Sequence, residues 1–143
     1  DVNVYYSAVA TSFPAFSSVY GSKINNVLGA GGTNVDDPAI AAYRAAHSEI
    51  TGKTADYWAS ANTYAALQIL EQAIVGAATL DRDTVTQYIK DNSFDTVMGD
   101  LSFKNNFSDT FWSVGQWQDG VFRGVKGSNV EGAVDVRLKD GWK

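Results

Sequence analysis

A long alanine-rich segment, Thr54 to Leu80, constrains the fold of this chain most strongly. Asp56 or Thr54 offers an acceptor for free N–H groups at its start, and Gly76 weakens its end. We expect this helix to pack against a β-sheet, with the turn Asp56-Tyr57-Trp58 near an edge where ligands bind; ordinary packing is the alternative role of the Tyr-Trp pair. Apolar residues at helical spacing predict its buried side: Ala61, Tyr64, Ala65, Leu67, Leu70 and Ile74.

Two strands and a glycine-rich loop are predicted before this helix. Residues 1–9 form a nearly continuous apolar run, which is typical of a strand covered on both faces in a parallel sheet. Pro14 suits the first turn of a short helix that Gly21 ends. A second strand is expected at residues 23–28. The loop at 29–34 follows it and is either a flexible connector or a ligand-lining loop, because it lacks the lysine of a phosphate-binding loop.

Two further helices have clear start signals. Asp36-Asp37-Pro38 places a carboxylate cap before a proline at the first helical position, and this helix is expected to reach about Glu49. Asp81 is the cap of another helix, expected to reach about Asn92.

After Ser93 the pattern changes to short runs typical of strands. Residues 111–118 and 121–125 flank Asp119-Gly120, and an Asp-Gly pair in this setting predicts a two-residue hairpin. We expect the hairpin to be an appendage or a crossing to another lobe. Residues 126–143 are expected to form an extended tail lying on the domain.

The order of these segments predicts the α/β class, with a parallel sheet flanked by helices and a late β-hairpin. A length of 143 residues suits a single domain, here residues 1–143. No apolar run approaches the roughly 18 residues that a membrane span needs. The chain opens with Asp-Val-Asn-Val rather than a signal sequence, so an exported protein would be present here in its mature form or as a fragment.

Composition excludes several classes of function. The net charge is −5 and the eleven basic residues are scattered, which argues against nucleic acid as a partner. The absence of cysteine excludes disulfides, thiolate metal sites and cysteine nucleophiles. No acidic cluster has the spacing of a calcium loop, and we expect neither a metal nor a cofactor.

Catalytic machinery is not evident in the sequence. His47 is the sole histidine, so any Ser-His-Asp arrangement must use it. It lies late in an amphipathic helix, where a histidine is favoured by the helix dipole alone, and a solvated or partly packed role is the simpler interpretation.

Three stretches resemble one family. Residues 38–75, PAIAAYRAAHSEITGKTADYWASANTYAALQILEQAIV, resemble the late helices of type I periplasmic binding proteins, the branched-chain amino-acid group of ABC-transporter substrate-binding proteins. Residues 94–125, with FDTVMGDLSF and VGQWQDGVF, resemble the segment that follows in the same family. Residues 4–16, VYYSAVATSFPAF, are similar to the strand and loop that begin the second lobe.

The resemblance implies one lobe of a hinged, two-lobed binding protein whose other, N-terminal lobe is missing from this chain. It implies an extracytoplasmic location, binding of a small polar, aromatic or amino-acid-like ligand rather than catalysis, and delivery to a membrane permease. Family members bind ligands with loops at the carboxyl ends of strands, in agreement with the general rule for open α/β sheets.

Mapped onto this chain, the resemblance implies two roles for the site residues. The hydroxyls of Thr11 and Ser12, with nearby main-chain amides, would hold a polar end of the ligand, and Tyr57 and Trp58 would cover its apolar body. The full predicted set is Ser7, Ala10, Thr11, Ser12, Gly31, Thr33, Tyr57 and Trp58.

The chain also departs from the family pattern. Family members are much longer, and segments are expected to be shortened or missing near 17–23 and 32–36. Leucine binders carry an acidic residue in the glycine-rich loop, whereas none lies near Gly31, which argues against an α-amino acid ligand. Two alternatives remain open: a ligand-sensing receptor or regulatory module of the same fold, and a small hydrolase using His47.

Overall fold

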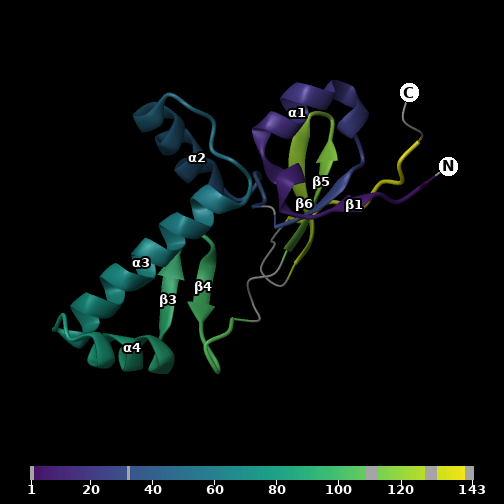
Figure 1. Ribbon diagram of the computed structural model, residues 1–143. Helices are drawn as coiled ribbons and strands as arrows, with labels where there is room; N and C mark the ends of the chain where they lie inside the picture. Colours follow the sequence, from purple (N-terminus) through teal and green to yellow (C-terminus); the bar gives the residue numbers. More distant parts are fainter. Residues whose placement is uncertain (1, 32, 109–112, 128–131, 141–143) are drawn as a thin grey trace.

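The computed structural model describes residues 2–31, 33–108, 113–127 and 132–140, and Figure 1 shows how their elements are arranged. The strands are β1 (Tyr6–Ser7), β2 (Leu28–Ala30), β3 (Ser93–Thr96), β4 (Gly99–Ser102), β5 (Ser113–Gln118) and β6 (Val121–Gly127). The helices are α1 (Pro14–Tyr20), α2 (Pro38–Thr51), α3 (Ala59–Ala77) and α4 (Arg82–Asp91), with 3-10 turns η1 (Val9–Ser12) and η2 (Gly21–Ile24). The predicted α/β class is confirmed.

The larger sheet has the strand order β1-β2-β5-β6. β1 and β2 are parallel, whereas β2–β5 and β5–β6 are antiparallel, so the sheet is mixed. The predicted hairpin is confirmed: Gln118 pairs with Val121, and both Asp119 (φ 54°) and Gly120 (φ 81°) have the positive φ of a type I′ turn. Its expected role as an appendage or a crossing is wrong, because β5 pairs with β2 and the hairpin makes up half of this sheet.

The first strand is shorter and more exposed than predicted. Only Tyr6–Ser7 pairs as a strand, and Val2, Val4 and Tyr6 are about half exposed (55%, 54% and 50%). The expectation of burial on both faces is wrong because β1 lies at the edge of its sheet. The second strand also begins later than predicted, since η2 occupies the start of the segment expected at 23–28.

Large aromatic side chains form the core that packs against the larger sheet. Trp117 and Phe122 are almost fully buried, with ring centroids 5.4 Å apart, and Ile24, Val27 and Tyr57 complete the cluster. The Trp117 Nε1–H donates to the Thr11 carbonyl at 2.7 Å, which satisfies the one polar group of the indole.

A second core lies between α3, α4 and the two-stranded β3–β4 sheet, which are drawn at the lower left of Figure 1. The buried side of α3 consists of Ala61, Ala65, Ile69 and Ala73, and its three alanines let neighbouring elements approach closely. The predicted stripe is wrong in part, because Tyr64, Leu67 and Leu70 are 46%, 59% and 45% exposed. The helical spacing of apolar residues did not by itself show which side of α3 faces α4 and β3.

The helix starts follow the predicted caps. The Asp37 carboxylate accepts from the amides of Ala39 and Ile40, and that of Asp81 accepts from the amide of Thr84. Asp56 lies just ahead of α3 and accepts from the amides of Trp58, Ala59 and Ser60.

The tail is extended over residues 132–140 and lies against the larger sheet; residues 128–131 and 141–143 of the predicted tail fall outside the described residues. Buried Gln116 and Gln118 bond to the main chain of Arg137 and Asp135. Lys139 is buried, its ammonium donates to the carbonyls of Lys23 and Asn25, and burial lowers its pKa.

Among the residues described, no helix combines the length and apolar character that crossing a membrane would require.

Asp56→Ala is expected to destabilise the protein by about 1–2 kcal/mol, because it removes the acceptor for the first amides of α3. Urea unfolding measures this loss, with Asp56→Asn retaining part of the cap and Asp100→Ala, at an exposed position of β4, as the control. Equal stability of Asp56→Ala and Asp100→Ala would contradict this role.

The contribution of Asp81 is expected to depend on pH. The Thr84 hydroxyl and amide lower the pKa of the Asp81 carboxyl below its usual 3.8. A depressed carboxyl pKa stabilises the folded state above the unfolded-state pKa, and this stabilisation is lost as pH falls through the folded-state pKa. The stability difference between the parent protein and Asp81→Ala, measured by urea unfolding, should therefore narrow as the pH is lowered from 7 to below 3.8. A difference that stays constant over this range would contradict the assignment.

Candidate functional site

The carboxyl ends of the two parallel strands lie at one edge of the larger sheet. β1 leads directly into η1, and β2 leads into Gly31. The segment 55–58, just before α3, joins them: the Tyr57 amide donates to the Ser12 carbonyl at 3.1 Å, and the Thr33 amide donates to the Tyr57 carbonyl at 2.9 Å. Three segments far apart in sequence therefore meet where open α/β sheets place their ligands.

Gly31 and Trp58 are in direct contact at this edge. Gly31 has a φ of 75°, and a Cβ atom built there would lie 2.0 Å from Trp58 Cδ1. Only glycine permits both this conformation and this approach. The Trp58 ring thus lies against the main chain after β2, while its side chain stays partly accessible.

The free N–H groups at the start of α3 are already bonded to a carboxylate of the protein itself. Asp56 Oδ1 is 2.8 Å from the Trp58 amide and also accepts from the amides of Ala59 and Ser60. The helix N-terminus is therefore occupied by an internal carboxylate rather than open to an anionic group of a ligand.

Arg44 holds the segment before α3 in place. Its Nη1 donates to the carbonyls of Ala55 (2.8 Å) and Asp56 (3.1 Å), and its guanidinium carbon lies 4.2 Å from the centroid of the Tyr57 ring. Sequence reasoning missed this residue. The signal available was that Arg44 is the one lysine or arginine of this helix.

The predicted site residues fall into two groups. Thr11, Ser12, Thr33 and Tyr57 are buried, and the Thr11 and Ser12 hydroxyls donate to the carbonyls of Ala8 (2.9 Å) and Val9 (2.7 Å). The Tyr57 ring packs on Trp117 and Phe122 in the core. The accessible or partly accessible members are Ser7, Ala10, Gly31 and Trp58.

The carboxylates near this edge are engaged. Asp56 and Asp37 cap helices, and Asp36 forms an ion pair with Arg123. Among the residues that the structure describes, no group of three or more His, Cys, Asp or Glu side chains is arranged to hold a metal ion. Trp58 is partly accessible at this edge.

His47 lies elsewhere, in the last turns of α2. Its Nδ1 is 3.1 Å from the Lys53 carbonyl and 3.3 Å from the Thr51 hydroxyl oxygen. Within the described part of the chain, its ring has no carboxylate partner of the kind that orients a catalytic histidine.

Gly31→Ala is expected to displace the Trp58 ring and to destabilise the protein by roughly 1–3 kcal/mol, because the new methyl group meets the indole and the residue keeps a strained φ. Gly52→Ala is the matched control, since Gly52 has a similar φ of 68° with open space around it. The measurements are urea unfolding and the NMR signal of the Trp58 indole N–H. A Gly31→Ala protein no less stable than Gly52→Ala, with the indole signal unmoved, would contradict the contact.

No protein-family model matches this chain, and no curated protein matches its sequence. Solved structures do match. A Leu-, Ile-, Val-, Thr- and Ala-binding protein from Brucella ovis, in its closed conformation, aligns with a TM-score of 0.73 and 16% identity over 90% of this chain and 38% of its own.

Two other solved structures represent the range of ligands among these neighbours. A leucine-binding protein from Thermotoga maritima has a TM-score of 0.66 and 17% identity over 83% of this chain and 35% of its own. An ABC-transporter solute-binding protein from Rhodopseudomonas palustris in complex with benzoate has a TM-score of 0.62 and 12% identity over 85% of this chain and 35% of its own.

This chain thus spans little more than a third of the length of these structures. At sequence identities of 12%, 16% and 17%, the similarity shows a shared fold. The chain shares the fold of the corresponding part of these structures, that of a type I periplasmic binding protein.

Proposed function

We propose that this chain is part of an extracytoplasmic solute-binding protein of an ABC importer. The observation that carries the proposal is the meeting of three segments at the carboxyl ends of β1 and β2, with Trp58 lying on Gly31. The solute-binding activity of the structural neighbours supports it. The chain would bind its ligand without chemical conversion, and the complex would be received by a membrane permease.

We assign the binding of the apolar part of the ligand to this chain. The partly accessible Trp58 indole offers a flat surface beside Gly31, which suits an aromatic or branched apolar group. The Thr11 and Ser12 hydroxyls are turned inward and bonded, so they are better placed to shape the loop than to hold a polar group.

Recognition of the polar end of the ligand is assigned to the part of the protein beyond this chain. Among the residues that the structure describes, Asp56 caps α3, Asp36 pairs with Arg123, and Arg44 is bonded to main-chain carbonyls. A lobe that faces Trp58 across a cleft would supply those contacts, and its closure would depend on contacts made only in the shut state.

Trp58→Ala in the intact protein is expected to weaken ligand binding by roughly tenfold or more, because a stacked aromatic surface is lost. Calorimetry with a panel that includes leucine, benzoate and benzamide would identify a ligand and measure the loss. Trp58→Phe should retain most of the affinity.

Leu80→Ala is the control for this experiment. Leu80 is 81% exposed and lies beyond the far end of α3, roughly 28 Å along the helix from Trp58. Affinities that are the same for Trp58→Ala and Leu80→Ala would contradict the proposed site.

A further inference from the structure

The outer side of α3 is apolar, although it is exposed in this chain. Tyr64, Leu67 and Leu70 are each about half exposed, and we call the surface that these three side chains form the outer face of α3. At 3.6 residues per turn, Leu67 lies directly opposite the middle of the buried stripe of the helix. The helix therefore has one apolar side packed on α4 and β3 and a second apolar side that no core residue of this chain covers.

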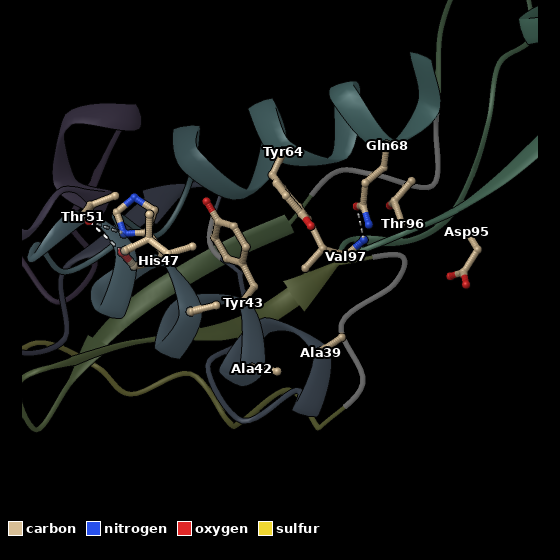
Figure 2. Close-up of a pocket in the computed structure, with 12 residues that line it drawn as sticks. Ala39, Ala42, Tyr43, His47, Thr51, Tyr64, Gln68, Asp95, Thr96 and Val97 are labelled. Carbon is tan, nitrogen blue, oxygen red and sulfur yellow. Dashed lines mark hydrogen bonds between the residues drawn. The ribbon is translucent and has the colours of Figure 1, made fainter. Parts of the chain in front are cut away.

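A groove continues this apolar surface at Tyr64. It lies between α2 and α3 and has a volume of about 650 Å³. Figure 2 shows the side chains of Tyr43, from α2, and Tyr64, from α3, pointing toward one another, and their ring centroids are 5.1 Å apart. Ile50, which is 84% exposed, also lines the groove. The groove and the outer face thus form one exposed apolar surface.

Charge distinguishes α3 from α4. Glu71 is the one charged residue among the 19 residues of α3. The shorter α4 has exposed Arg82, Asp83, Lys90 and Asp91, the polar outer side that is typical of a helix in contact with water. A helix that is apolar on all sides is typical of the interior of a larger protein.

The sheet that packs on α3 is small. β3 and β4 have four residues each, and in the described part of the chain no further strand joins their sheet. A two-stranded sheet is at best marginally stable in water and needs further strands or a helix packed on it. The sheet and the outer face of α3 both indicate a further layer of protein around this helix.

The length of the structural neighbours identifies the source of that layer. This chain spans little more than a third of the length of the solved structures that share its fold. We propose that the outer face of α3 and the adjoining groove are an intramolecular docking surface, which the part of the same polypeptide outside this chain covers in the intact protein. The inference shares with the proposed function only the premise that this chain is part of a longer protein.

A second copy of this chain suits the surface less well. Glu71 is exposed one turn after Leu67, and α3 contains no lysine, arginine or histidine. A two-fold pairing of outer faces would place Glu71 of both copies in one apolar interface, where neither helix supplies a positive partner. The covering segment is therefore expected to be apolar opposite Leu67 and to place a hydrogen-bond donor opposite Glu71.

Thiol labelling of the intact protein tests the proposal. This chain contains no cysteine, so Leu67→Cys introduces a single reporter here, and labelling of the parent protein is the background. The Leu67→Cys thiol is expected to react with Ellman's reagent about tenfold or more slower than that of Leu138→Cys, because a covered thiol is inert. Leu138 is the matched control, since it is 62% exposed and Leu67 is 59% exposed. Rates are normalised to those of each variant unfolded in urea.

Hydroxyl-radical footprinting of the unsubstituted protein is the second measurement, and it does not depend on the folding of a variant. Leu67 and Leu70 should be oxidised more slowly than Leu138, although the three leucines are similarly exposed in this chain.

Three results would overturn the proposal. Equal protection of Leu67 and Leu138 would show that the outer face is open to water. Protection of Leu67 that is lost on dilution would identify a second copy as the occupant. Protection that appears only with ligand would identify a ligand-dependent contact. The binding assay on Trp58→Ala is separate from these measurements, so failure of the solute-site proposal would leave this result standing.

Discussion

The anchoring of Tyr57 is the interaction on which the rest of the structure depends. Its amide and carbonyl bond to Ser12 and Thr33, its ring is buried against Trp117 and Phe122, and Arg44 covers the ring from α2. One residue thus ties the loops after β1 and β2 to the segment before α3. Since α3 begins two residues later, its direction away from the sheet is set at this point.

This anchor also separates two packing regions that differ in character. The sheet core is built from large aromatic rings, whereas α3 meets α4 and β3 mainly through alanines. Tyr57 belongs to the first core and Ala61, one helical turn later, to the second. The candidate site at Trp58 lies at the carboxyl ends of β1 and β2, next to this division, and a groove of about 650 Å³ opens between α2 and α3.

Local signals with a defined geometry could be predicted from the sequence. Asp37 before Pro38 and the Asp119-Gly120 turn each satisfy specific backbone groups, and both were found where expected. Which elements lie next to a given strand or side chain in the fold could not be predicted in this way. An apolar run such as residues 2–9 has the same pattern whether it forms an edge strand or a central strand of a sheet. A hydroxyl such as that of Ser12 can bond either to a ligand or to a carbonyl of its own turn, and the sequence does not distinguish the two. Arg44 was missed because its partners are carbonyls eleven and twelve residues away.

The tail over residues 132–140 is held largely through its main chain, which bonds to the side chains of Gln116 and Gln118 on β5. Of its own side chains, Lys139 is buried and donates to the carbonyls of Lys23 and Asn25. Main-chain contacts do not depend on which amino acids the tail carries. Exchanging the exposed side chains of the tail would therefore leave its course unchanged, whereas Gln116, Gln118 and Lys139 carry the contacts that fix it.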